Sequence, residues 1–422
     1  MANNTASNYT AKLSKAFLPA FESSRVVTKT VDTQMISAVG ASNGGEVSVK
    51  RPHDYNAYRS SGGDISSTGS SEIIAGKATA VVQDYITVAA NWSDLEEALQ
   101  LDQLDKIIAP MAVRACTTLE TSLAAYMRKN CNLSVGTPGT AVDAWADVAG
   151  AGALMNATGV PMDSDCYYVA DPYSVQNLAG VQQGLSNGQD SLVDTAWGNA
   201  QVSNNVGGLK VITSNALSAF TNGVCADRAG TLSGAPTPTY VAHKDTMIQS
   251  IAVTGMQAAG VIVAGEIIEI TGFYRLNQST RELVLGADGA PIKWRGVCTT
   301  TVTLSSGAGT LLVAGPAIYE AGGQYNTVNA AITTGAVINV LGTSGGSVQP
   351  NLFYKKDSFG LATVKLSKLY AQDTVMVTKD GISIRCTKYA DGDTNVQKVR
   401  FDILPAFASF SPFTAGLGYG IA

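Results

Sequence analysis

The chain has 422 residues, a formal net charge of −5, 43 glycines and only 14% charged residues. Its length predicts two or three domains, and its composition is typical of many strands and turns with weakly charged surfaces. The acidic balance and the lack of clustered Lys and Arg exclude a dedicated nucleic-acid binder.

Export, membrane and metal functions find little support. The first ten residues are polar, so we expect no signal peptide and synthesis in a cytosol. The uncharged stretch 296–319 is broken into strand-sized pieces by Ser, Thr, Gly and Pro, which argues against a membrane span. Six scattered cysteines form no CxxC pair, so we expect reduced packing residues rather than a disulfide or metal framework.

Residues 1–33 are interpreted as a weakly amphipathic N-terminal arm that needs a neighbour to fold on. Its only apolar anchors are Ala11, Phe17, Leu18 and Phe21. Lys12 and Lys15 contribute to a mild basic excess. We interpret this excess as a solvated arm, with contact to a partner or nucleic acid as the alternative.

Residues 34–92 predict an extended β finger. A strand over 46–50 leads to a flexible Ser- and Gly-rich tip, and a return strand spans 78–89. Such a hairpin is marginal in water unless something packs against it. Charges of alternating sign follow the outgoing strand, at Arg51, Asp54, Arg59 and Asp64. They could pair with a neighbouring copy and set its register, or form a solvated tip.

The strongest local pattern is a long amphipathic helix over residues 93–129. Ser93 and Glu96 form a capping box at its start, and two basic residues occupy its last turn. Pro110 should kink it. Apolar residues at steps of three and four predict one buried stripe, formed by Leu101, Leu104, Ile108, Met111, Ala115, Leu119, Leu123 and Met127.

An α+β layer is expected after this helix. Helices are predicted over 143–158 and 173–178, with a buried strand over 166–170 between them. Residues 182–205 are polar and interrupted by glycine, so we expect a surface loop.

From about residue 223 the pattern changes to short strands. About six strands in 120 residues predict a small barrel or sandwich that ends at the GTSGG stretch 342–346. The strand-like runs are 248–253, 262–270, 282–285, 296–304 and 310–313. Beyond them we expect a hairpin, 374–377 with 382–387, and a further strand over 397–404.

Catalytic signals are weak. Residues 184–188 (GLSNG) fit a nucleophile elbow around Ser186, and His243 follows in the order of a hydrolase. Because the flanking residues are polar, a plain Gly-rich loop explains the motif better. His53 and His243 are expected to be surface or turn residues, and the Asp-Gly-Asp at 391–393 to turn a hairpin. No catalytic, cofactor or metal residue is therefore assigned.

Taken in order, several segments resemble the major capsid proteins of tailed phages. The arm is followed by GEVSVKRP at 45–52, AVVQDYITV at 80–88 and the capped helix. The later segments GEIIEITG (265–272), YNTVNAA (325–331) and NLFY (351–354) resemble the coat proteins of short-tailed Salmonella- and Shigella-type phages.

This resemblance implies an α+β capsid fold with an N-terminal arm, an extended finger, a long spine helix and an inserted β-barrel. The implied segments are 1–33 (arm), 34–92 (finger), 93–131 (spine), 132–222 (peripheral and axial domain), 223–345 (inserted β domain) and 346–422 (return of the parent domain).

The resemblance also implies partners. Copies would form pentamers and hexamers around a scaffolding protein, in a closed icosahedral shell with a portal protein. They would assemble in the host cytoplasm and meet packaged double-stranded DNA only by proximity, with no membrane, cofactor or catalysed reaction. The family's acidic scaffold contact is not evident in an arm that carries Lys12 and Lys15. Two other functions stay open, namely a serine hydrolase using Ser186 and an extracellular β-rich adhesin or surface-layer subunit.

Overall fold

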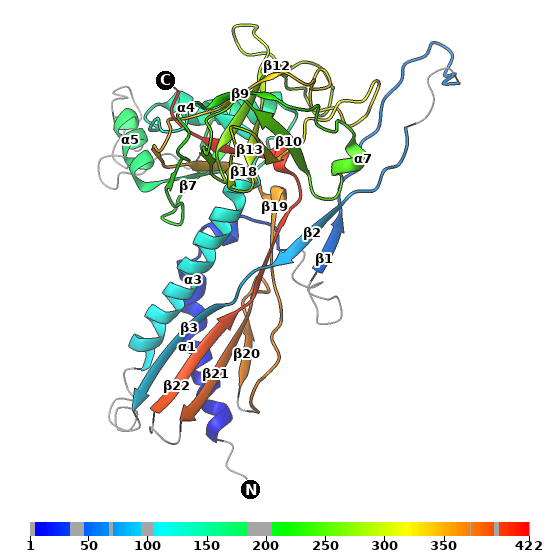
Figure 1. The fold of residues 1–422 in the computed structure, drawn as a ribbon. Helices are drawn as coiled ribbons and strands as arrows, with labels where there is room; N and C mark the ends of the chain where they lie inside the picture. Colours follow the sequence, from blue (N-terminus) through cyan, green and yellow to red (C-terminus); the bar gives the residue numbers. More distant parts are fainter. Residues whose placement is uncertain are drawn as a thin grey trace. The chain divides into compact units, whose positions relative to one another are not determined.

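A computed structural model gives the fold and describes residues 5–33, 46–66, 71–93, 104–183, 205–371, 373–391 and 396–421 (Figure 1). The chain forms two compact units, each built from three stretches of sequence. Unit 1 comprises residues 1–49, 79–124 and 359–409, and unit 2 comprises residues 50–78, 125–358 and 410–422.

A four-stranded antiparallel sheet and an N-terminal helix form one half of unit 1. The strand order is β20 (Thr374–Val377), β21 (Ser383–Asp391), β22 (Val396–Ile403) and β3 (Ile86–Ser93). Helix α1 (Thr5–Ser24) packs its Phe17 ring on that of Phe401 in β22, with centroids 4.1 Å apart. The arm therefore folds on its own unit, and the expectation that it needs a neighbour is wrong for these residues.

Helix α3 (Leu104–Lys129) carries the expected apolar stripe and continues through Pro110. Of the predicted positions, Ile108, Met111, Ala115, Leu119, Leu123 and Met127 are buried. The predicted helix start is wrong, because Ser93 pairs with Val396 as the last residue of β3. Glu96 lies outside the described residues.

A buried carboxylate ties α3 to the segment that follows α1. Glu120 accepts hydrogen bonds from Thr28 N and Thr28 Oγ1, at 3.2 and 3.1 Å, and from Val26 N. Thr28 belongs to the short 3-10 helix η1 (Val27–Lys29). A carboxylate that accepts several hydrogen bonds avoids most of the penalty for burying a charge, so Glu120 fixes this turn inside unit 1.

The second sheet of unit 1 contains the strands that lead into and out of the finger. Its strand order is β1 (Glu46–Lys50), β2 (Lys77–Val82), β23 (Pro405–Ser409) and β19 (Phe359–Thr363). The return strand predicted over 78–89 is in fact two strands, β2 and β3, in different sheets. Between them, Gln83 N donates to Pro405 O at 2.8 Å, so the chain leaves one sheet and enters the other.

Unit 2 contains a six-stranded sheet with two helices. Its strand order is β4 (Leu133–Val135), β24 (Ala415–Gly418), β18 (Asn351–Lys355), β5 (Cys166–Ala170), β7 (Leu209–Thr213) and β6 (Asn205–Val206). Helices α4 (Trp145–Ala157) and α5 (Pro172–Gln183) confirm the predicted helices, and β5 has its predicted bounds. Their shared core includes Leu133, Val148, Met155, Tyr168, Leu178 and Phe353.

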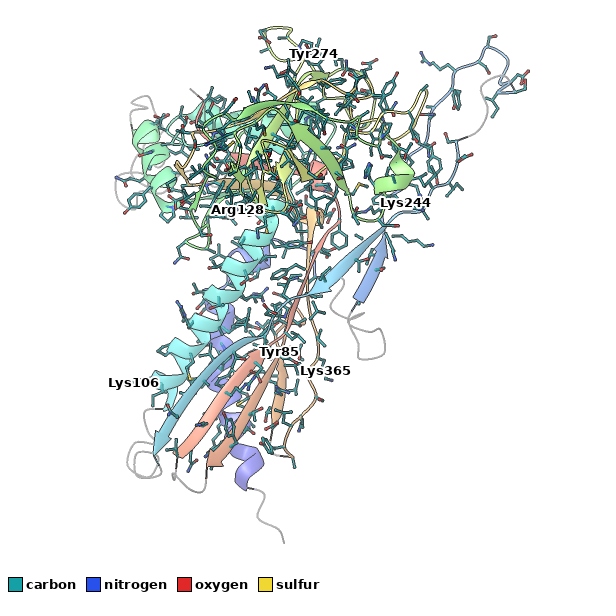
Figure 2. The ribbon with its side chains drawn as sticks, viewed as in Figure 1. Tyr85, Lys106, Arg128, Lys244, Tyr274 and Lys365 are labelled. Atoms are coloured by element: carbon teal, nitrogen blue, oxygen red, sulfur yellow. The ribbon has the colours of Figure 1, made fainter. Side chains whose placement is uncertain are left out.

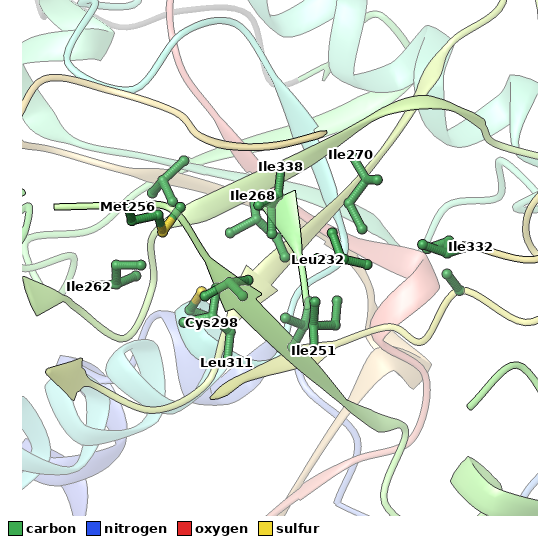
Figure 3. Close-up of a cluster of buried hydrophobic side chains, with 14 of the residues drawn as sticks. Leu232, Ile251, Met256, Ile262, Ile268, Ile270, Cys298, Leu311, Ile332 and Ile338 are labelled. Carbon is green, nitrogen blue, oxygen red and sulfur yellow. The ribbon is translucent and has the colours of Figure 1, made fainter. Parts of the chain in front are cut away.

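The predicted inserted barrel is confirmed as a closed six-stranded barrel in unit 2 (Figure 3). Its order is β10 (Ile248–Thr254), β15 (Gly309–Ala314), β13 (Lys293–Cys298), β12 (Ile267–Tyr274), β16 (Val337–Val340) and β9 (Ala229–Leu232). Inward-facing residues such as Ile251, Ile268, Leu311 and Ile338 fill it, together with the fully buried Trp294.

Short elements complete unit 2. Two small ladders pair β11 (Val261–Ile262) with β14 (Val302–Thr303) and β8 (Phe220–Thr221) with β17 (Ser347–Val348). The strand predicted over 282–285 is wrong, because that segment makes only isolated bridges. The short helices are α7 (Tyr240–His243), η5 (Lys356–Ser358) and η6 (Pro412–Thr414). Among the described residues, no helix combines the length and apolar character needed to cross a membrane.

Candidate functional site

The part of unit 2 that projects farthest is the finger, defined here as residues 50–78 (Figure 1). Its base is held by Arg51, whose backbone N donates to Gly76 O at 2.9 Å across the two arms of the finger. The buried Arg51 guanidinium donates to three backbone carbonyls, Lys244 O at 3.0 Å, Asp245 O at 3.2 Å and Phe410 O. Lys244 is labelled in Figure 2.

Burial lowers the pKa of Arg51 to about 10, against the opposing effect of Tyr240, Tyr126 and Asp245. The guanidinium therefore stays charged at neutral pH. Loss of these hydrogen bonds would leave a buried positive charge without any acceptor, which would cost a large amount of free energy. Arg51 thus determines where the finger leaves the unit.

Further contacts hold the arms of the finger against the loops that connect the barrel strands. Asp54 pairs with Arg281, and Asn56 Nδ2 donates to Gly322 O at 2.8 Å. On the return arm, Gln324 Nε2 donates to Glu72 O at 2.7 Å. These contacts order an extended segment that would be marginal alone.

Beyond these anchors, the finger exposes large side chains. Tyr55, Tyr58, Ile65 and Ile73 are all exposed, Ile73 to 73%. Arg59 and Asp64 are also exposed. The pKa of Asp64 is lowered by hydrogen bonds from the backbone and side chain of Ser66, so its carboxylate is ionised at neutral pH. Apolar and charged side chains on a projecting segment mark a surface suited to a partner.

The structure separates the predicted contact residues into two groups. Arg51 and Asp54 are used within the chain itself. Arg59 and Asp64 on the finger, and Lys12 and Lys15 on α1 of unit 1, are exposed, and their role in subunit contacts stays a prediction. The residues that accept hydrogen bonds from Arg51 were not predicted from the sequence. They act through backbone carbonyl groups such as Lys244 O, which every residue type has.

The hydrolase hypothesis gains no support from His243. Its Nδ1 and Nε2 lie 3.0 Å from Ile248 O and 2.8 Å from Thr237 O. A histidine held between two carbonyl acceptors has no free nitrogen for a nucleophile, and a general base needs one. Ser186 and its GLSNG motif lie outside the described residues.

Metal and thiol chemistry are also unsupported where the structure describes the chain. Within those residues, no group of three His, Cys, Asp or Glu side chains is placed to hold a metal ion. All six cysteines are buried, and none of them forms a disulfide. Burial raises the pKa of the Cys298 thiol to about 12, and a thiol is unreactive when it is not ionised.

Comparisons with known proteins identify the family. Residues 1–420 match the family model described as P22 coat protein, gene protein 5. The major capsid protein of Acyrthosiphon pisum secondary endosymbiont phage 1 is 40% identical over 424 residues, covering 100% of both chains. Solved structures with similar folds include the capsid of the cyanophage P-SCSP1u (TM-score 0.43, 11% identity, 90% of this chain and 84% of that one). A second is Mycobacterium phage Che8 (TM-score 0.43, 10% identity, 93% and 90%).

Proposed function

Because the chain belongs to the P22 coat protein family, we propose that its copies assemble as pentamers and hexamers around a scaffolding protein, in the cytoplasm of the host. The chain is a structural subunit of a phage head shell, and hence of the virion, and not an enzyme. A portal protein would occupy one vertex of the closed shell. The phage would be a short-tailed one of the Salmonella or Shigella type.

The observation that carries this proposal is the match over residues 1–420, which covers both units and the finger. The finger supports the proposal physically. It exposes Tyr55, Tyr58, Ile65 and Ile73 on a projecting segment, and exposed apolar surface of this kind is typical of a site that a partner covers. A second copy would remove these side chains from water.

Closed shells are built from many weak, identical contacts. Each contact becomes effectively intramolecular once its neighbours are made, so modest surfaces give a stable lattice. A finger anchored through Arg51 presents its side chains in a fixed direction, which lowers the entropic cost of each contact.

The charge of the chain fits a container for DNA. A net charge of −5 gives little attraction to phosphate. Packaged double-stranded DNA would therefore lie against the shell by proximity, without a dedicated site.

The test is to express the chain with a scaffolding partner and examine the product by negative-stain electron microscopy. Uniform closed particles are expected. As a control, a Tyr55→Ser/Tyr58→Ser variant should keep the circular dichroism spectrum of the parent and give fewer particles. A parent chain that stays monomeric at every concentration, with and without the scaffolding partner, contradicts the proposal.

A further inference from the structure

A cleft of about 540 Å³ lies within unit 2, between helix α4, strand β4 and the segment that joins β12 to β13. Its volume falls within the range of about 300–1,000 Å³ that is typical of small-molecule sites, and it exceeds what one aliphatic side chain from a partner would fill. All of the residues that line it belong to unit 2. The cleft is therefore a complete site within a single copy of the chain.

The space exists because one face of α4 carries small residues. Gly150, Ala153, Leu154 and Ala157 line the cleft, and their spacing of three, four and seven residues places them on one face of the helix. Three of these four residues are glycine or alanine, which reach too little to fill the gap to the segment opposite. The fold thus leaves room beside α4 that its own side chains do not occupy.

The other walls of the cleft are mainly aliphatic. They include Val135, Leu285, Ile292 and Ile421. Leu285 and Ile421 are 52% and 54% exposed, so large apolar surface faces water around one concavity. Apolar surface of this kind gains free energy when a ligand removes it from water. The body of a matching ligand is therefore an apolar chain.

The accessible charges of the cleft are positive. Lys293 and Arg295 line it with side chains that are 51% and 28% exposed, and none of the described residues that line it is acidic. Glu269 accepts hydrogen bonds from Lys293 Nζ at 2.8 Å and from Arg295 Nε at 2.9 Å. One carboxylate facing two cations leaves one positive charge uncompensated. The complementary head group of a ligand is therefore anionic.

We propose that the cleft binds a single-chain anionic amphiphile such as a fatty-acid carboxylate. The chain lies along the small face of α4, and the carboxylate meets Lys293 Nζ and the two Nη atoms of Arg295. A lysine ammonium has three donors and a guanidinium five, so both side chains can hold this head group while they keep Glu269. The site goes beyond the shell function, because it requires neither a second copy nor a scaffolding protein.

Isothermal titration calorimetry of the unassembled full chain with saturated fatty acids tests the site. We expect one dodecanoate per chain. From octanoate to dodecanoate the affinity should rise about fourfold for each added methylene group, which corresponds to about 0.8 kcal/mol. Dodecanol, which has the same chain without the charge, should bind about tenfold more weakly, because it lacks the charge-assisted hydrogen bonds. Equal affinities of dodecanol and dodecanoate, or an affinity that does not depend on chain length, overturn the inference.

Two variants with the same substitution on α4 separate the cleft from general apolar binding. Ala153→Leu places a larger side chain in the cleft and should weaken dodecanoate binding severalfold. Ala146→Leu is the matched control, because Ala146 lies on the same helix but does not line the cleft, and it should leave the affinity unchanged. Both alanines are exposed, so both variants should fold. Equal affinities in the two variants contradict the proposed location.

A third variant tests the head group. Lys293→Gln should weaken the binding of dodecanoate severalfold and leave that of dodecanol unchanged. A loss of equal size for both ligands contradicts a contact between Lys293 and the carboxylate. Cosedimentation with phosphatidylglycerol vesicles distinguishes a free amphiphile from a lipid bilayer. A chain that sediments with these vesicles and does not bind dodecanoate overturns the inference.

Discussion

Arg275 donates to Asn132 twice, from Nη1 to the side-chain Oδ1 and from Nη2 to the backbone oxygen at 3.2 Å. In return, Asn132 Nδ2 lies 3.0 Å from both Arg295 O and Gly315 O. Burial lowers the pKa of Arg275 to about 9, with a further contribution from the charge of Arg295. Asn132 precedes β4, whereas Arg295 lies in β13 and Arg275 and Gly315 directly follow β12 and β15, so this buried pair joins the six-stranded sheet to the barrel inside unit 2.

Replacement of Asn132 should therefore destabilise unit 2. Asn132→Ala leaves a buried guanidinium and several carbonyl groups without partners, and we expect a loss of about 3 kcal/mol in the free energy of unfolding. Urea unfolding followed by tryptophan fluorescence measures it. Asn339→Ala removes only an exposed 3.4 Å contact to Thr271 Oγ1 and should change the free energy by less than about 0.5 kcal/mol. Equal losses in the two variants would refute the structural role of the pair.

A substitution at Gly315 tests the same contact between Asn132 and the barrel through the backbone. It has φ +77°, and an added Cβ would lie 2.2 Å from Asn132 Nδ2. Gly335 has a similar φ of +82°, but a Cβ there meets nothing within 4 Å. Gly335→Ala should cost about 1 kcal/mol of backbone strain, whereas Gly315→Ala should cost that plus the displacement of Asn132. A comparison of the two unfolding midpoints isolates the steric effect, and indistinguishable midpoints would argue against it.

Truncation of the α1 anchor should destabilise unit 1. Phe17 is fully buried and stacks on Phe401. Phe17→Ala should cost about 3–5 kcal/mol, because it leaves a cavity between helix and sheet. Calorimetry should show a lower unfolding temperature. Lys15→Ala, on the exposed face of the same helix, is the control and should leave the transition almost unchanged.

The acid stability of unit 1 should depend on Asp402. Burial alone would raise the pKa of its carboxyl, but hydrogen bonds from Arg385, Arg400 and Thr87 outweigh this effect and hold the pKa below its usual value. Arg385 Nη2 and Arg400 Nε donate to it at 2.7 and 2.6 Å. A depressed carboxyl pKa stabilises the fold above the unfolded-state value of about 3.9, and this stability is lost as the pH falls through the folded-state pKa.

An Asp402→Asn variant should therefore be less stable than the parent at pH 7, and its unfolding temperature should fall less between pH 5 and pH 3. Thermal scans across this range measure both effects. Parallel pH dependences of the parent and the variant would exclude Asp402 as the titrating group.

Local sequence patterns predicted the elements whose formation depends on residues nearby in the sequence. Helix α4, strand β5 and strand β20 lie at or near their expected bounds because burial periodicity and turn residues specify them. The barrel was expected from the spacing of its longer strands. Its closing strands β9 and β16 have only four residues each, with no strong alternation, so they become strands by pairing with each other and with β10 and β12.

Elements that depend on distant partners were missed. Ser93 and Glu96 make a plausible capping box, but Ser93 lies in a ladder with β22, more than 300 residues away in sequence. Tertiary pairing outweighs a capping signal worth about 1 kcal/mol. Similarly, α1 packs on the sheet through Phe17, which stacks on Phe401, and no pattern within the first 33 residues could indicate this partner.

For the candidate site, the sequence identified the charged residues of the finger but not which of them would be buried within the chain. Arg51 and Arg59 have the same side chain on one extended segment, yet Arg51 is buried among carbonyls and Arg59 is exposed. Only the position of residues 244–245 and 410 in space distinguishes them.

The closed barrel has a consequence for how related shells can diverge. Since every strand of the cylinder has two neighbours, it presents no unpaired edge that could recruit strands from adjacent copies at the crowding found in a head. The outward residues of this barrel can therefore change without exposing a strand edge that would promote aggregation between copies.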